Sequence, residues 1–134
     1  MSIDISARGA RMARIWIRIA VLYLLFGACF GAVMGMTHDL QYAPVHAHIN
    51  LLGWATLALA GILYHLFPQA GGSRLGLTHF WLHNLSLPPL MLALFLMLGG
   101  NQSLEPVVGV LSLVMVLALL TFAVNLFLNM GKAA

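Results

Sequence analysis

The sequence predicts an all-α integral membrane protein, and two observations carry that prediction. Apolar residues make up 62% of the 134-residue chain and charged residues only 7%, whereas a soluble domain carries about 25% charged residues. No soluble fold of this size can hide so much apolar surface behind so few charges. The chain also contains four apolar stretches, each near the roughly 20 residues that an α-helix needs to cross a bilayer. We therefore expect a single membrane domain over residues 1–134, with four transmembrane helices.

The four predicted spans cover residues 15–36, 45–67, 77–98 and 107–128. Short connections separate them, and each connection carries proline or glycine at a helix edge, where these residues end helices. No small-residue cleavage site followed by a mature domain accompanies the first apolar run, so we expect a retained span there rather than a signal peptide.

Basic residues gather on one side of the predicted membrane. They lie before or at the start of the first span, in the second connection and after the fourth span: Arg8, Arg11, Arg14, Arg18, Arg74 and Lys132. The other two connections, residues 37–44 and 99–106, hold no lysine or arginine. The positive-inside rule then places both termini in the cytoplasm and these two connections outside, as expected at a bacterial inner membrane. The small net charge of +3 reflects this bias and does not indicate nucleic-acid binding.

Histidines are the chief candidates for chemistry, because ionisable residues inside spans are costly and usually functional. His46 and His48 stand one residue apart at the outer end of the second span. On a helix two residues subtend about 200°, so the two imidazoles point to nearly opposite sides. They cannot easily share one metal ion, but they can serve two sites on the two flanks of the helix. A pair of interfacial polar residues is the alternative interpretation.

The stretch from Val45 to Pro68 resembles the tenth helix of subunit I in the haem-copper oxidases and nitric oxide reductases. That helix begins with His-x-His, runs through an alanine–glycine pair and ends in aromatic residues closed by a proline. The corresponding residues here are His46, His48, Ala60, Gly61, Tyr64, Phe67 and Pro68. The run His79-Phe80-Trp81-Leu82 resembles the start of the family's next helix, so about forty residues are covered. The resemblance implies that His46 and His48 are each an axial ligand of a haem iron, most simply of haem b, near the outer face.

Neighbouring residues are candidates for the rest of a haem pocket. Asn50 and Trp54 follow the histidines on the second span, and Leu51, Leu57, Phe80 and Trp81 would add apolar walls. The outer connections lack the arginines that hold haem propionates in the family, so the candidate propionate contacts are His38, Gln41 and Tyr42. Ordinary helix packing is the alternative for Trp54, and an interhelical hydrogen bond is the alternative for Asn50. A solvated loop residue is the alternative for His38.

A second group of histidines lies toward the cytoplasmic side. His79 and His83 are four residues apart and share a helix face, which suits metal ligation. His65 ends the second span, so the three side chains are candidates for a second metal or haem site. The alternative is that they anchor helix ends at the membrane interface.

The helix number suggests an assembly of several copies. The family's subunit I has about twelve helices in three similar arcs of four, and a homotrimer of this chain would rebuild that arrangement. His46 of one protomer and His48 of the next would then bind one iron from both faces, with a dimer as the nearest rival. Gly27, Gly31 and Gly35 form a small-residue ridge on the first span. We expect this ridge to be a packing face, with an interface between subunits as one use.

The function that these patterns favour is a b-type cytochrome for electron transfer, or for binding or sensing a diatomic gas such as NO or O2. Its partners would be lipid, further copies of the chain and a respiratory-chain electron donor or acceptor. No copper-site histidines or tyrosine motif are found, so oxygen reduction by a full oxidase is not expected. The alternatives are a histidine-based copper- or zinc-binding or transport protein, and a cofactor-free accessory subunit of a respiratory complex.

Overall fold

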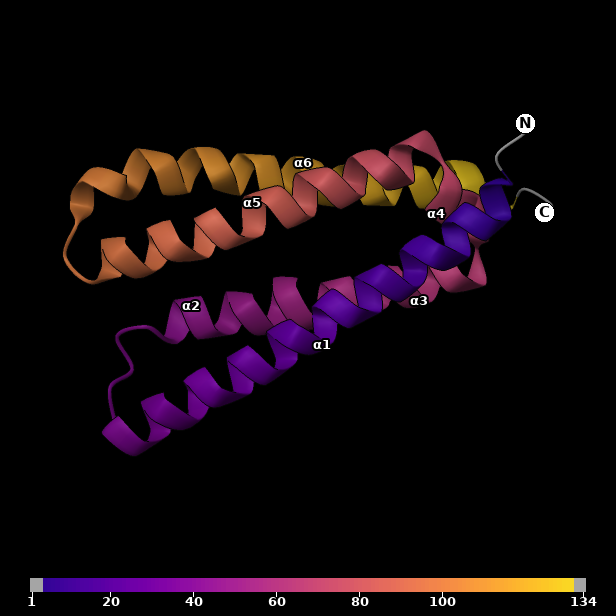
Figure 1. Ribbon diagram of the computed structural model, residues 1–134. Coiled ribbons are helices and arrows are strands. Elements are labelled where there is room, and N and C mark those ends of the chain that lie inside the picture. Colours follow the sequence, from indigo (N-terminus) through magenta and orange to yellow (C-terminus); the bar gives the residue numbers. More distant parts are fainter. Residues whose placement is uncertain (1–3, 132–134) are drawn as a thin grey trace.

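The computed structural model describes residues 4–131, which form two helical hairpins packed side by side (Figure 1). The first hairpin pairs α1 (Ile5–Thr37) with a second span made of α2 (Ala43–His48), η1 (Ile49–Ala55) and α3 (Thr56–Leu66). The second pairs α5 (Arg74–Leu98) with α6 (Glu105–Asn129), after the 3-10 turn η2 (Gln102–Leu104). The short helix α4 (Pro68–Gly72) joins the hairpins.

Four helical segments are long and apolar enough to cross a membrane: Ile5–Thr37, Ala43–Leu66, Arg74–Leu98 and Gln102–Asn129. The prediction of an all-helical chain with four spans is thus confirmed. The start of α1 and the end of α6 lie at the same end of the molecule as α4, here called the terminal end (Figure 1). The opposite end, with residues 38–42 and 99–101, is called the loop end. Which end faces the cytoplasm stays a prediction.

Helix α1 begins ten residues before the span predicted at residue 15. The Asp4 carboxylate caps it by accepting hydrogen bonds from the backbone amides of Ser6, at 2.9 Å, and Ala7, at 3.3 Å, as N-cap residues do. The helix ends at Thr37, and the next residue, His38, has a φ of 55° in the left-handed region. His38 is therefore the C-terminal cap of α1, with an exposed side chain.

The second connection is packed against α1 rather than looped out. The backbones of α1 and α4 approach so closely that a Cβ on Gly9 would lie 2.1 Å from the Pro68 carbonyl oxygen. A Cβ on Gly72 would lie 2.1 Å from the carbonyl oxygen of Ile5. The Arg8 guanidinium donates to the Gly72 carbonyl, which is a free acceptor at the end of α4. The first turns of α1 and the five-residue helix α4 therefore form one packed unit.

The second span is not a uniform α-helix. Seven residues after His48, Ile49–Ala55, are wound as a π-helix, and the Thr56 hydroxyl donates to the Leu51 carbonyl five residues back at 2.8 Å. Such π segments are rare and occur often at functional sites. The π segment Ile49–Ala55 begins at the residue after His48 and so adjoins the two candidate ligands.

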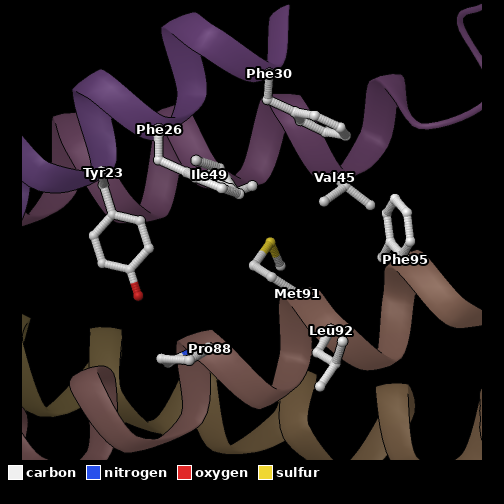
Figure 2. Close-up of a pocket in the computed structure, with 9 residues that line it drawn as sticks. All are labelled: Tyr23, Phe26, Phe30, Val45, Ile49, Pro88, Met91, Leu92 and Phe95. Carbon is white, nitrogen blue, oxygen red and sulfur yellow. The ribbon is translucent and has the colours of Figure 1, made fainter. Parts of the chain in front are cut away.

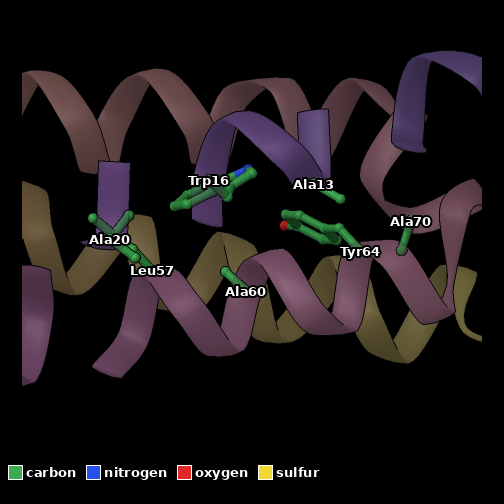
Figure 3. Packing of buried hydrophobic residues seen from close by; sticks show 7 residues of the cluster. All are labelled: Ala13, Trp16, Ala20, Leu57, Ala60, Tyr64 and Ala70. Carbon is green, nitrogen blue, oxygen red and sulfur yellow. The ribbon is translucent and has the colours of Figure 1, made fainter. Parts of the chain in front are cut away.

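The core consists of two clusters. One lies toward the terminal end and joins α1, α3 and α4 through small and aromatic residues (Figure 3): Ala13, Trp16, Ala20, Leu57, Ala60, Tyr64 and Ala70. The other joins α2, η1, α5 and α6: Val45, Ile49, Leu87, Leu90, Met91, Met115 and Ala118. Only 11% of the most apolar window of α6 and 17% of that of α1 are buried. The remaining apolar faces are available to lipid or to further copies of the chain.

Candidate functional site

The two candidate ligands stand on opposite flanks of α2 at the loop end. Val45 and Ile49 are buried and define the face of the helix that packs toward α5. His46 and His48 lie to either side of that face, because each is offset from it by roughly a quarter turn. His46 is half-buried toward α1, whereas His48 is exposed on the surface. The angular separation expected from the His-x-His spacing is thus present.

The two ring nitrogens of His48 differ, because Nδ1 is hydrogen-bonded within the helix and Nε2 is not. Its Nδ1 lies 2.7 Å from the Pro44 carbonyl oxygen. A carbonyl only accepts hydrogen bonds, so Nδ1 carries the hydrogen, and the neutral ring keeps its lone pair on Nε2. Histidines that bind metals are oriented in the same way, with one ring N–H donated to a carbonyl or carboxylate. The free Nε2 belongs to an exposed side chain, so a ligand held by another copy of the chain can reach it.

His46 is wedged between α1 and its own helix. A Cβ on Gly31 would lie 2.5 Å from the His46 Cε1, and the Phe30 ring centre is 6.3 Å from the imidazole centre. The Asn50 amide donates to the His46 carbonyl at 2.9 Å and lies 3.4 Å from its Nδ1. A Cβ on Gly27 would in turn lie 2.7 Å from the Asn50 side-chain oxygen. Asn50 therefore positions the backbone and ring of His46 from within the same chain.

The glycine ridge on α1 serves packing inside the chain. Gly27 contacts Asn50 and Gly31 contacts His46, while nothing lies within 4 Å of a Cβ placed on Gly35. The ridge thus brings α1 close to the histidine helix, as small residues allow in membranes. Only its last member is open to another copy of the chain.

An apolar groove of about 400 Å³ lies beside the histidine helix, between the two hairpins (Figure 2). Val45 and Ile49 face it from one side, and its nearly wholly apolar lining is Tyr23, Phe26, Phe30, Val45, Ile49, Pro88, Met91, Leu92 and Phe95. Phe30 both lines this groove and contacts His46. The flat apolar walls nearest the histidines therefore come from α1 and α5.

The apolar residues expected from the sequence as walls of a haem pocket are divided between the core and the surface, and a role of Trp54 in such a pocket stays a prediction. Leu57 is fully buried in the terminal-end cluster, and Trp54 and Phe80 pack against the same cluster. Trp81 is 52% exposed. The expectation that Leu57 forms a haem wall is corrected, because its side chain already fills the core between α1 and α3.

The candidate propionate contacts in the outer connection are engaged with α5. The Gln41 amide donates to the Leu98 carbonyl, and the Tyr42 ring stacks on Phe95 with ring centres 4.3 Å apart. These contacts fasten the connection to the end of α5. A role of His38, Gln41 or Tyr42 toward propionates stays a prediction.

The second group of histidines is divided between core and surface. His79 and His83 are fully buried, whereas His65 is exposed. Within residues 4–131, no three histidine, cysteine or carboxylate side chains gather as metal ligands do. The structure therefore does not bring His65 together with His79 and His83. His79 and His83 are packed inside the protein, and their depth in the membrane stays a prediction.

The buried pair belongs to a polar network that the sequence did not reveal. The Tyr64 hydroxyl lies 2.9 Å from His79 Nδ1, and His83 Nε2 lies 3.0 Å from the Leu52 carbonyl oxygen. Asn125 of α6 contacts the Tyr64 hydroxyl at 3.2 Å. One signal in the sequence was an amide, Asn125, inside the predicted span 107–128.

Comparison with known proteins gives one partial match. The chain is 38% identical over 56 residues to the "Cbb3-type cytochrome c oxidase subunit CcoN1" of Stutzerimonas stutzeri. The match covers 37% of this chain and 12% of that protein, so the chain spans a small part of its relative's length. No family model and no solved structure matches the chain. The partial match supports a distant relationship to the haem-copper oxidases, as the sequence resemblance predicted.

Proposed function

We propose that this chain, a distant relative of a cytochrome oxidase subunit over part of its length, is a membrane-embedded haem b protein with His46 and His48 as axial ligands. The site would lie near the outer face of a bacterial inner membrane. Its partners would be lipid, other copies of the chain and a respiratory electron donor or acceptor. The porphyrin supplies four of the iron ligands, so one or two histidines suffice.

The observation that carries the proposal is the state of His48. Its Nδ1 is held by the Pro44 carbonyl at 2.7 Å, which fixes the ring and leaves Nε2 as a lone-pair donor. An exposed imidazole on a membrane-spanning helix is costly in lipid unless both of its ring nitrogens have partners. A haem iron presented by a neighbouring chain would supply that partner.

His46 fits the role of second ligand through its surroundings. The ring stands beside Phe30, and Asn50 fixes its backbone. Phe30 and the other groove residues offer flat apolar surface that would keep water from a porphyrin. Gly31 leaves the space that the imidazole occupies.

The two flanks of one helix point to an assembly. Since His46 and His48 face nearly opposite ways on α2, a bis-histidine iron requires one ligand from each of two chains. Repetition of that contact around a closed ring gives a homotrimer with three equivalent sites. When bound, haem supplies a one-electron redox centre if both axial positions are filled, or a binding position for NO or O2 if one is open.

The test is the haem content of the purified protein and its variants, measured by absorbance after expression with added haem. His46→Ala and His48→Ala are each expected to lose low-spin haem. His65→Ala is the matched control, because His65 is an exposed histidine on the same span at the terminal end, and it should keep full occupancy. Added imidazole should restore the low-spin spectrum of a His48→Gly variant by occupying the vacated space.

Other outcomes separate the alternative functions. Full haem content in the double variant of His46 and His48 would overturn the ligand assignment. A colourless protein that binds copper or zinc would favour a metal-binding or transport function. A colourless protein without metal, isolated only within a larger respiratory complex, would favour an accessory subunit.

A further inference from the structure

A row of buried polar groups, called the file here, runs through the interior from α6 to the π segment of the second span. Its members are Asn125, Tyr64, His79, His83 and the Leu52 carbonyl. The Asn125 amide nitrogen lies 3.2 Å from the Tyr64 hydroxyl, which lies 2.9 Å from His79 Nδ1. One turn further along α5, His83 Nε2 lies 3.0 Å from the Leu52 carbonyl oxygen. All of these side chains are buried, so each hydrogen has few possible positions.

The partners of Asn125 fix the hydrogen of Tyr64. The Asn125 oxygen accepts from the Ser73 hydroxyl at 2.7 Å and from the Asn129 amide at 2.8 Å. Its nitrogen therefore faces the Tyr64 oxygen and donates to it, and it also reaches the Ala70 carbonyl at 3.0 Å. The Tyr64 hydroxyl is left to donate its own hydrogen to His79 Nδ1.

The two histidines are consequently in defined tautomers. His79 accepts at Nδ1, so its neutral ring carries the hydrogen on Nε2. His83 faces a carbonyl with Nε2, so that nitrogen carries the hydrogen and Nδ1 keeps the lone pair. The row of hydrogen bonds is therefore interrupted between the two histidines. On one side stands the donor Nε2–H of His79, and on the other the acceptor Nδ1 of His83.

Neither His79 Nε2 nor His83 Nδ1 has a hydrogen-bond partner among residues 4–131. His79 Nε2, His83 Nδ1 and the indole Nε1 of Trp16 are buried without a hydrogen bond, although buried polar groups normally have one. The three rings adjoin one another: the Trp16 ring centre is 4.5 Å from that of His79 and 5.7 Å from that of His83, and the histidine rings are 5.5 Å apart. Two donors and one acceptor are the set that one water molecule satisfies, since buried waters typically make about three hydrogen bonds.

We propose that one water molecule binds between Trp16, His79 and His83. It accepts from Trp16 Nε1 and His79 Nε2 and donates to His83 Nδ1. The file is then continuous from Asn125 to the Leu52 carbonyl, and each group donates in the same direction, which strengthens every bond in the chain. The water joins α1 and α5 to the π segment that follows His48.

A metal ion is the less suitable occupant of this site. It would need a lone pair on both inner nitrogens, but the Tyr64 hydroxyl gives its hydrogen to His79 Nδ1 and so keeps a hydrogen on Nε2. The site proposed here is independent of the haem ligands and stands whether or not His46 and His48 bind haem.

The test is solid-state NMR of the full-length protein in lipid bilayers, with 15N-labelled histidine and tryptophan. Magnetisation transferred from water should reach the protonated Nε2 of His79 and Nε1 of Trp16, and the 15N shifts should show Nε2–H tautomers for His79 and His83. Absence of transfer to both nitrogens would show a dry site, with N–H groups directed at ring faces, and would overturn the proposal. Copper or zinc bound in equimolar amount, with Nε2 of His79 deprotonated, would also overturn it.

Two variants test the acceptor. His83→Leu removes it and should abolish the water transfer to His79, whereas His83→Asn places an amide oxygen near the former Nδ1 and should retain it. His65→Leu is the control, because it removes an exposed histidine and should leave the His79 and Trp16 signals unchanged. Transfer that persists unchanged in a folded His83→Leu protein would contradict the bridging water.

Discussion

The imidazole of His46 lies against the backbone of Gly31, so closely that a Cβ at Gly31 would stand 2.5 Å from Cε1 of the ring. Gly31→Ala should therefore displace the ring and weaken haem retention about tenfold or more, the size of effect seen when groups that orient a metal ligand are changed. Haem titration of the apoprotein measures this. Gly35→Ala is the control, because nothing lies within 4 Å of its Cβ. Equal haem affinity of the two variants would show that the position of His46 does not matter.

Ligation across chains predicts complementation between two inactive variants. Chains carrying His46→Ala and chains carrying His48→Ala each lack one ligand at every interface. In a mixed oligomer, an interface that joins the intact His46 of one chain to the intact His48 of another regains both. Co-expression with two affinity tags and tandem purification should yield low-spin haem that neither variant shows alone. Mixed oligomers without haem would contradict ligation of one iron by His46 of one chain and His48 of another.

Tyr42 allows its structural and ligand-binding roles to be separated. Its ring stacks on Phe95 with centres 4.3 Å apart, so Tyr42→Leu should destabilise the loop end by about 1 kcal/mol. Tyr42→Phe keeps the ring and should leave stability nearly unchanged. Unfolding in mixed micelles measures the first effect. A loss of haem affinity in Tyr42→Phe would assign the hydroxyl to a propionate contact, and unchanged affinity would leave only the packing role.

The contact between α1 and α4 should be intolerant of added atoms. A Cβ on Gly9 would stand 2.1 Å from the Pro68 carbonyl oxygen, and the backbone can yield only by separating the two helices. Gly9→Ala should therefore lower stability by about 1–3 kcal/mol, as overpacking does. Gly109→Ala is the matched control in open space on α6. The midpoints of thermal unfolding in detergent compare them, and equal midpoints would show that α4 is not packed in this way.

The membrane fold was predictable from the sequence because the lipid environment imposes a simple rule on apolar length. The second span was expected at residues 45–67 and is found at Ala43–Leu66. The start of α1 was missed because its arginines lower the hydropathy over the first turns. Contacts with α4 hold those turns in place. These contacts join residues about sixty positions apart in the sequence, so a local window of hydropathy does not detect them.

The site was predictable only in part. Helical geometry alone placed His46 and His48 on opposite flanks. The π segment and the apolar groove depend on how α1, α5 and the second span pack together, so no local sequence pattern predicts them. The burial of His79 and His83 likewise depends on partners on the second span, the Tyr64 hydroxyl for His79 and the Leu52 carbonyl for His83. Their spacing of four residues suits a metal site and a core equally well.

The most direct test of haem ligation by His46 and His48 is the optical spectrum of the detergent-purified protein, oxidised and then reduced with dithionite. Bis-histidine ligation predicts a sharp Soret band with narrow α and β bands on reduction, and the loss of these bands in His46→Ala and His48→Ala. A colourless protein from cells supplied with haem, or a haem spectrum unchanged in both variants, would contradict it.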